Sequence, residues 1–302
     1  MISQKIQLAK NLSLSRVVHG EMRLLEWDLS NQELLGFIQR CIEIGVTTFD
    51  HADIYGDYGC EKKFGDALKL ESSLRNKIEI ITKCGIKKLS DKFPSRVIGH
   101  YDYSYSHIVE SAETSLKNLN TDHIDVFLLH RPAPFFNPEE VAKAFNELHQ
   151  SGKVLYFGVS NFTPIQFQSL QAHLDQRLVT NQVEISPYNL EHFDNGNIDF
   201  FLKEEIKPMA WSPLAGGSLF NPQDEKAHRL VSTLKEIAEE LGLEHIDSVI
   251  YAWLLNHPIQ ILPIVGSGKF ERIKTAVDAL QINMNLEQWY KIWVASKGHR
   301  VP

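Results

Sequence analysis

Four side chains with acid–base chemistry stand at or just past the C-terminal ends of three apolar, strand-like runs. They are Asp50 and Tyr55 in TTFDHADIY, Lys83 in IEIITKC and His130 in IDVFLLHRP. Parallel strands that are buried on both faces read as continuous apolar runs, and their C-terminal ends form the rim where loops bind ligands. Each residue alone is more often structural. An acid, a phenol, an amine and an imidazole on one rim together predict a catalytic site.

The four groups suit proton transfer to a carbonyl oxygen. A phenol with a pKa near 10 is a poor proton donor at neutral pH unless its anion is stabilised. We expect the ammonium of Lys83 to lower the pKa of Tyr55, and Asp50 to supply the counter-charge that a partly buried ammonium needs. His130 would then orient a substrate oxygen. Such a site can protonate an alkoxide as it forms, which is carbonyl reduction if a hydride donor lies opposite.

The later strand ends carry groups suited to a cofactor that donates hydride. Side-chain amides suit a carboxamide, an aromatic ring suits stacking on a flat ring, and a Gly-rich backbone suits a pyrophosphate. The sequence offers these groups in order as Ser160 and Asn161, Gln182, Trp211, and the run SPLAGG that begins at Ser212. A nicotinamide dinucleotide fits all three requirements.

The last strand-like run ends in LPIVGSGKFERI, at the start of a helix. Exposed amides and the helix dipole attract phosphate there, and the segment contains Gly266, Ser267, Lys269 and Arg272. Its GSG lacks the third glycine of the dinucleotide fingerprint, which disfavours a Rossmann fold, and glycine before a helix is often simple turn chemistry. The two cationic residues favour NADP over NAD, with surface solvation as the alternative.

Strand-like and helical runs alternate along the chain and would position these groups. We expect strands at 45–50, 78–83, 124–129, 154–159, 179–185, 208–211 and 260–265. We expect helices at 31–44 after a Ser30 cap, and at 61–70, 105–119, 138–151, 164–174, 197–205, 225–241, 245–256 and 270–279. Such alternation implies parallel pairing through right-handed crossovers.

This pattern predicts an α/β fold, a (β/α)8 TIM barrel with 45–50 as its first strand and 260–265 as its last. A doubly wound open sheet is the alternative, but polar residues recur on nearly every strand end. An N-terminal β-hairpin of IQL and LSLS and a C-terminal outer helix at 286–297 complete the prediction. No Pro/Gly/Ser-rich linker divides residues 1–302, so we expect a single domain. The aromatic loop FPSRVIGHYDYS is expected to cover the mouth.

Composition narrows the classes of function. Hydrophobic residues make up 43% of the 302 residues and charged residues 23%, as in ordinary globular proteins. The 31 basic and 38 acidic residues give a net charge of −7 without a basic block, so no nucleic-acid partner is expected. No apolar run approaches the roughly 20 residues that span a bilayer, and no signal peptide is evident. We expect a cytoplasmic protein without a membrane partner. Cys41, Cys60 and Cys84 lack C-x-x-C spacing and are expected to be buried or incidental thiols.

Several segments resemble the motifs of the aldo-keto reductase family, in order along nearly the whole chain: FDHADIYG, ITKCG, DVFLLHRP, GVSNF, NQVEISPYN and MAWSPLAGG. VTTFDHADIYGDYGCE, HQSGKV and PIVGSGK are similar to its bacterial YdhF-like branch. The resemblance implies an aldo-keto-reductase-type barrel that reduces aldehydes or ketones with NADP(H). It also implies a catalytic tetrad of Asp50, Tyr55, Lys83 and His130, with Tyr55 as general acid.

The resemblance also implies how the cofactor is held. Ser160, Asn161 and Gln182 would hold the carboxamide, and Trp211 would stack on the nicotinamide. The pyrophosphate would lie along Ser212, Pro213, Leu214 and Gly216, and the 2′-phosphate beside Gly266, Ser267, Lys269 and Arg272. Departures from the family pattern are His51 after the aspartate, Ala276 at a frequent adenine contact, and Gly20, Glu21, Met22 and Arg23 at the first strand-like end. We expect these four to shape the substrate pocket, with Gly20 and Met22 also beside the cofactor, and His51 to be a packed or rim histidine.

Two other functions remain open at this point. One is a non-catalytic or redox-sensing subunit that binds NADPH within a larger assembly. The other is a metal hydrolase that uses His51, Asp53 and His130, although no metal site is our expectation. Substrate choice is expected to depend on loop residues, here Met22, Trp27, 86–104, Arg131–Asn137 and those after Trp211. The aromatic residues Tyr101, Tyr103, Phe135 and Phe136 would suit a ring-bearing substrate, or would pack against each other.

Overall fold

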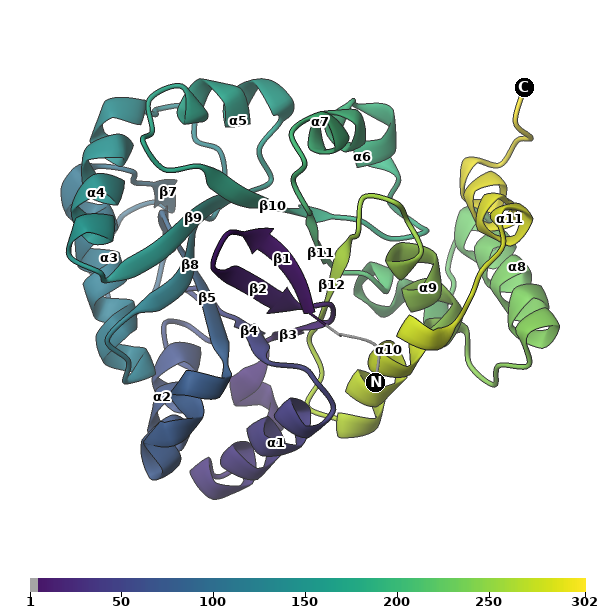
Figure 1. Cartoon of the computed structure of the whole chain (residues 1–302), viewed down its shortest axis with the longest axis horizontal. Coiled ribbons are helices and arrows are strands. Elements are labelled where there is room, and N and C mark those ends of the chain that lie inside the picture. Colours follow the sequence, from purple (N-terminus) through teal and green to yellow (C-terminus); the bar gives the residue numbers. More distant parts are fainter. Residues whose placement is uncertain (1–4) are drawn as a thin grey trace.

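The computed structural model describes residues 5–302, and its centre is a closed barrel of eight strands (Figure 1). Around the barrel the order is β10, β11, β12, β3, β4, β5, β8 and β9, and every neighbouring pair is parallel. The bounds are β3 Val18–Gly20, β4 Thr48–Asp50, β5 Glu79–Cys84, β8 Ile124–Leu129, β9 Val154–Ser160, β10 Leu178–Glu184, β11 Met209–Trp211 and β12 Leu262–Val265. The predicted barrel is confirmed, and all eight C-terminal ends open on one rim.

The first barrel strand is β3, so the prediction that 45–50 comes first is wrong. All seven predicted strand ranges overlap a barrel strand, but 45–50 corresponds to the second strand, β4. β3 has only three residues, too few for a periodic signal. His19 of β3 pairs with Val265 of β12 on one side and with Phe49 of β4 on the other. Partners far away in sequence therefore make this segment a strand.

Helices surround the barrel and follow most of its strands (Figure 1). Their bounds are α1 Asn31–Glu43, α2 Cys60–Leu68, α3 Tyr105–Leu119, α4 Pro138–Gln150, α5 Pro164–Gln171, α6 Glu191–Asp194, α7 Asn197–Lys203, α8 Glu225–Leu241, α9 Ile246–Leu255, α10 Phe270–Asp278 and α11 Leu286–Lys297. The predicted Ser30 cap is confirmed as a capping box with Glu33. The short helix α6 and the 3-10 segment at 69–77 were not predicted.

The N-terminal end of the barrel is closed by the predicted hairpin, β1 (Lys5–Ala9) paired antiparallel with β2 (Leu12–Ser15). In Figure 1 the hairpin lies across the middle of the ring of strands. Its buried side chains Ile6, Leu12 and Leu14 belong to one apolar cluster with barrel residues such as Val126 and Met209. This end of the barrel is therefore filled with aliphatic side chains.

The predicted C-terminal outer helix is also confirmed. α11 lies beside α8 on the outside of the molecule (Figure 1). Trp289 of α11 stacks on Trp253 of α9 with ring centroids 4.9 Å apart. Each indole N–H donates to the other residue's backbone carbonyl, at 3.2 and 3.1 Å. The reciprocal bonds satisfy both polar groups while the rings are buried.

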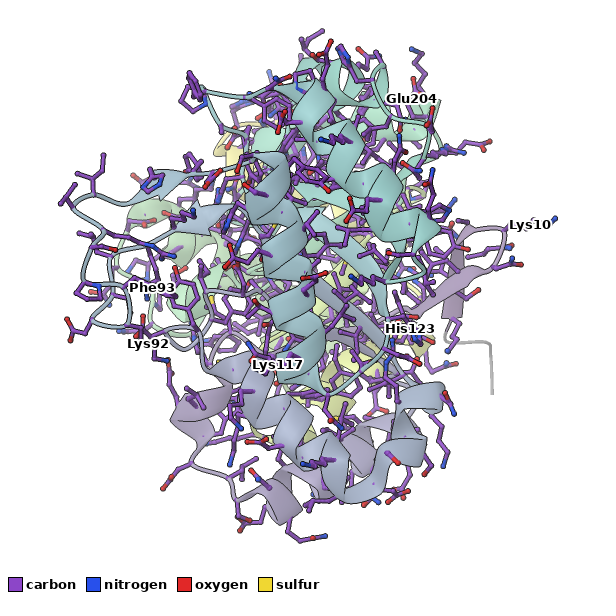
Figure 2. The ribbon with its side chains drawn as sticks, turned by 90° about the vertical axis from the view of Figure 1, so that its left-hand side faces the viewer. Lys10, Lys92, Phe93, Lys117, His123 and Glu204 are labelled. Carbon is purple, nitrogen blue, oxygen red and sulfur yellow. The ribbon has the colours of Figure 1, made fainter. Side chains whose placement is uncertain are left out.

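The loop between β5 and α3 contains a second antiparallel pair, β6 (Ile86–Lys87) with β7 (His100–Tyr101). This loop, part of which we expect from the sequence to cover the mouth, therefore contains regular secondary structure. Figure 2 shows Phe93 of this loop and Lys10 of the N-terminal hairpin projecting from opposite sides of the molecule. The three cysteines are buried and unpaired, as expected. Among residues 5–302, no helix is long and apolar enough to cross a membrane.

Candidate active site

The four predicted catalytic residues meet at the C-terminal rim of the barrel. Asp50 is the last residue of β4, Lys83 lies near the end of β5, and His130 directly follows β8. Tyr55 stands in the turn after β4, five residues beyond Asp50. Because neighbouring parallel strands end at the same side of the barrel, these distant segments present their side chains to one another.

Lys83 is the centre of this cluster and is fully buried. Its Nζ donates to Asp50 Oδ2 at 2.8 Å, to the backbone carbonyl of His51 at 2.7 Å and to Tyr55 OH at 3.1 Å. These three bonds use all three protons of the ammonium. Burial alone would lower the pKa of Lys83, but the attraction of Asp50 and Tyr55 outweighs it and the pKa is raised. The amine is therefore held in its charged form.

Lys83 lowers the pKa of Tyr55, as expected, but the pKa is nevertheless raised above its ordinary value. Burial is the main cause, and the charge of Asp50 adds to it. The cations Lys83 and Arg131 act in the opposite direction but do not outweigh burial. The phenol therefore keeps its proton at neutral pH, and the adjacent ammonium is placed to stabilise the anion once that proton leaves.

His130 faces Tyr55 with ring centroids 5.9 Å apart in an edge-on arrangement. Burial, followed by the charges of Lys83 and Arg131, holds the pKa of His130 well below its usual value. Its Nδ1 is buried and has no hydrogen-bond partner among residues 5–302. The ring is thus a neutral imidazole with one N–H, a group that can donate to an oxygen in the adjacent cavity.

A chain of polar side chains from β9, β10 and β11 continues the cluster. Gln182 Nε2 donates to the second oxygen of Asp50 at 2.8 Å. Asn161 Nδ2 donates to Ser160 Oγ at 2.8 Å, and Trp211 Nε1 donates to Asn161 Oδ1 at 3.0 Å. These bonds fix the orientation of two side-chain amides and an indole ring beside the tetrad. Such a set could hold a carboxamide and a flat ring.

A cavity of about 1750 Å³ opens beside the tetrad and runs towards α10. That volume exceeds the roughly 300–1,000 Å³ of a site for one small ligand, so it has room for a dinucleotide and a substrate. The predicted residues that line it are Gly20, Met22, Asp50, Tyr55, His130, Ser160, Asn161, Gln182, Trp211, Ser212, Pro213, Leu214, Gly216, Gly266, Ser267 and Arg272. Of the residues predicted for the tetrad and the cofactor site, two do not line it: Lys83 is fully buried, and Lys269 is exposed at the start of α10.

The segment after Trp211 offers open backbone to this cavity. Gly216 and Gly217 line it in the left-handed region, with φ of 64° and 94°. A Cβ added at either position would meet no atom within 4 Å. Free space over two glycine backbones fits the close approach of a pyrophosphate. The residues of this chain therefore fit a nicotinamide dinucleotide along the whole cavity.

The structure adds lining residues that the sequence did not single out as site residues. Ile54 borders the cavity, as do Ile86, Arg131 and Phe220, which we expect from the sequence only as residues of substrate loops. Arg131 lies 5.5 Å above the ring of Trp211, and within residues 5–302 its guanidinium has no hydrogen bond or ion pair. Its position directly after His130 was the feature of the sequence that could have identified Arg131 as a site residue.

Several residues expected at the pocket lie elsewhere. Glu21 is buried against His19, and Trp27 packs on His19 and Gly268. Tyr103 packs edge-on against Phe136, with ring centroids 5.7 Å apart. Neither aromatic residue lines the cavity, nor do Tyr101 and Phe135, so these rings do not indicate a ring-bearing substrate.

The alternative metal site is not assembled. His51 is fully buried and packs edge-on against Phe64 at 4.5 Å, as expected of a packed histidine. Asp53 instead accepts a hydrogen bond from Ser111 at 3.0 Å. In the described part of the chain, no group of three or more His, Cys, Asp or Glu side chains is arranged to hold a metal ion.

Comparisons with known proteins agree with this geometry. The family model described as "Aldo/keto reductase family" matches residues 16–295. The chain is 49% identical to oxidoreductase YdhF of Escherichia coli (strain K12), and 42% identical to a 6-dehydroglucose reductase of Agrobacterium fabrum, each alignment covering 99% of both chains. The crystal structure of the thermostable aldo-keto reductase Tm1743 superposes with a TM-score of 0.79 at 24% identity, covering 96% of this chain and 99% of the other.

The family model matches most of the chain, and the bacterial relatives align over nearly its full length. The structure agrees with both, because it is an eight-stranded barrel with an acid, a phenol, an amine and an imidazole on its rim beside a long cavity. This chain is therefore an oxidoreductase that belongs to the aldo/keto reductase family.

Proposed function

We propose that this protein, as a single barrel domain over 1–302, reduces aldehydes or ketones to alcohols with NADP(H), and that Tyr55 is the general acid. The observation that carries the proposal is the contact of Lys83 Nζ with both Asp50 and Tyr55 OH, with the phenol facing the cavity. A tyrosine paired with a buried, charged lysine can give up a proton and be stabilised as the anion. The bound dinucleotide would supply the hydride.

The tetrad residues have separate roles in this proposal. His130 donates its N–H to the carbonyl oxygen and orients it towards Tyr55. As negative charge develops on that oxygen, Tyr55 transfers its proton to it. Lys83 then faces a phenolate at 3.1 Å, and Asp50 keeps the ammonium in place. The raised pKa of Tyr55 keeps the phenol protonated until this moment.

We further propose a hydroxyl-bearing aldehyde as substrate. Arg23 and Arg131 line the cavity, as do the apolar residues Met22 and Ile86, and the charge of Arg131 acts on Tyr55 and His130. Guanidinium donors suit oxygen-rich ligands better than purely apolar ones. The Agrobacterium fabrum relative, at 42% identity, is named for reduction of 6-dehydroglucose, a carbonyl compound of this kind.

The test is oxidation of NADPH against a panel of carbonyl compounds that includes 6-dehydroglucose and simple apolar aldehydes, with NADH as the cofactor control. We expect turnover with NADPH and a preference for the hydroxyl-bearing aldehyde, which Arg131→Met reduces. Tyr55→Phe should keep NADPH binding and lose most turnover, because only the transferable proton is removed. Full turnover by Tyr55→Phe would overturn its role. NADPH binding without turnover on any carbonyl would instead favour a non-catalytic, cofactor-binding subunit.

A further inference from the structure

His19 and Glu21 form a buried pair that the proposed chemistry does not use. His19, on β3, is fully buried, and Glu21 is 1% exposed. The imidazole lies between two acceptors: Nδ1 is 2.6 Å from Glu21 Oε1, and Nε2 is 3.1 Å from the backbone carbonyl of Ser267. Ser267 belongs to the segment 266–269, between β12 and α10, of which Gly266 and Ser267 line the cavity.

This arrangement requires an additional proton. A neutral imidazole has only one N–H, yet both ring nitrogens of His19 face an oxygen acceptor. One proton must therefore lie on Nε2, and a second between Nδ1 and the Glu21 carboxylate. Burial by itself lowers the pKa of His19, but the charge of Glu21 and the two hydrogen bonds outweigh it and the pKa is raised.

The other histidine and the two thiols that interact electrostatically with the pair are neutral near pH 7, whereas Lys83 and Arg40 nearby are charged. The pKa of His51 is held well below its usual value, by burial, Lys83 and His19. Burial raises the pKa of the Cys41 and Cys60 thiols, with a further contribution from Glu21. The shared proton of His19 and Glu21 is therefore the one that this buried cluster loses as the pH rises above neutral.

The segment 266–269 is held at three points. His19 Nε2 donates to the carbonyl of Ser267, and Ser267 Oγ accepts from the backbone N–H of Lys269 at 3.2 Å. Trp27, 5.4 Å from the His19 ring, covers Gly268 so closely that an added Cβ would lie 2.5 Å from the indole. Because the peptide is trans, a Ser267 carbonyl directed at His19 directs the N–H of Gly268 the opposite way.

We propose that His19 and Glu21 are positioning residues that hold segment 266–269 in the form that binds the adenosine-side phosphate of NADP(H), and that loss of their shared proton at alkaline pH weakens cofactor binding. The inference rests on the proposed cofactor. Without the proton, a lone pair on Nδ1 faces a buried carboxylate, and repulsion displaces either the ring or Glu21. The hydrogen bond to Ser267 is then lost or distorted.

The test is the dissociation constant of NADPH, measured by fluorescence titration from about pH 6.5 to 9.5 with the wild type, Glu21→Gln and His19→Phe. In the wild type we expect affinity to fall about 3- to 10-fold as pH rises, the equivalent of one hydrogen bond. Glu21→Gln should bind at all pH values like the wild type at neutral pH, because its amide can donate to Nδ1 of a neutral ring. His19→Phe should bind weakly throughout, with kcat at saturating NADPH unchanged in both variants.

A matched control is His257→Phe, a partly buried histidine between α9 and β12 that packs against Phe193 and Trp289. It should keep the wild-type pH profile. If Glu21→Gln loses NADPH affinity at alkaline pH as the wild type does, the role of His19 and Glu21 is overturned, but the proposed cofactor is not. Wild-type NADPH affinity in His19→Phe has the same consequence. Absence of NADPH binding by the wild type at every pH overturns the proposed cofactor as well.

Discussion

The two ends of the barrel differ in the polarity of their buried side chains. The N-terminal end is closed by a hairpin whose Leu12 and Leu14 pack with barrel side chains in an aliphatic cluster. The C-terminal end buries a lysine and a neutral histidine beside a large cavity. Figure 2 shows the two ends projecting on opposite sides, marked by Lys10 of the hairpin and Phe93 of the loop after β5. Apolar burial stabilises the fold, whereas buried polar groups have a desolvation cost that only function explains.

The C-terminal rim also contains buried polar atoms that have no hydrogen-bond partner in the described chain. They are His130 Nδ1, both ring nitrogens of His51, Glu21 Oε2 and Asp53 Oδ1, and six further atoms of this kind, such as Arg16 Nε and Gln176 Oε1, lie elsewhere. Unpartnered polar atoms are rare in protein interiors and mark functional or strained places. The comparison therefore predicts that substitutions at one end change catalysis, and substitutions at the other change stability.

The largest effect is expected for Lys83→Met at the rim. The variant lacks the ammonium that stabilises the Tyr55 anion, so kcat should fall about a thousandfold, ~4 kcal/mol of transition-state stabilisation. Steady-state kinetics measures this, and NADPH titration should show the dissociation constant within about threefold of the wild type. A kcat near that of the wild type would show that the buried amine has no part in proton transfer.

Leu14→Ala tests the opposite end. Leu14 is fully buried in the hairpin cluster, so its truncation should lower the free energy of unfolding by about 3 kcal/mol, measured by urea denaturation. The kcat and KM of the folded protein should not change. Ile165→Ala, at a side chain that is 73% exposed, is the control and should change stability by less than about 0.5 kcal/mol. Altered kcat in Leu14→Ala would break the separation between the two ends.

Asp53→Asn tests whether a buried carboxyl group at the rim makes the free energy of unfolding decrease as the pH rises. Burial and the charge of Glu61 raise the pKa of Asp53 to about 8, against roughly 3.9 in an unfolded chain. The folded state therefore holds a proton that the unfolded state releases, and stability falls as pH rises between these two values. The asparagine cannot titrate, so the variant should lose about 1–2 kcal/mol less than the wild type over that window. Parallel unfolding curves for both proteins from pH 5 to 8 would contradict this.

Lys269→Ala should have the smallest effect. Lys269 is exposed and does not line the cavity, whereas Arg272 does. A solvated lysine contributes about 0.3–1 kcal/mol to anion binding, so NADPH affinity should fall about two- to fivefold. Arg272→Ala should weaken NADPH more, and neither substitution should change NADH affinity. A larger loss for Lys269 than for Arg272 would reverse their assigned importance.

The local sequence pattern was sufficient to predict much of the fold and the four residues of the tetrad. Apolar runs followed by helical periodicity located seven barrel strands, and the polar residues at their ends located Asp50, Lys83 and His130. The eighth strand could not be found in this way, because β3 has three residues and depends on hydrogen bonds to β4 and β12. The sequence alone places Trp27 at the pocket because its contacts with His19 and Gly268 join segments that are separate in the sequence.

The barrel and the kinds of group on its rim follow from residue pattern alone, because strand and helix periodicities are local and parallel strands end on one side. How those groups behave depends on the three-dimensional packing. It buries Tyr55 enough to raise its pKa against the effect of Lys83. It also brings His19 to Ser267, 248 positions away in the chain. Burial and long-range pairing are sums over many distant contacts, so no local run of residues can reveal them.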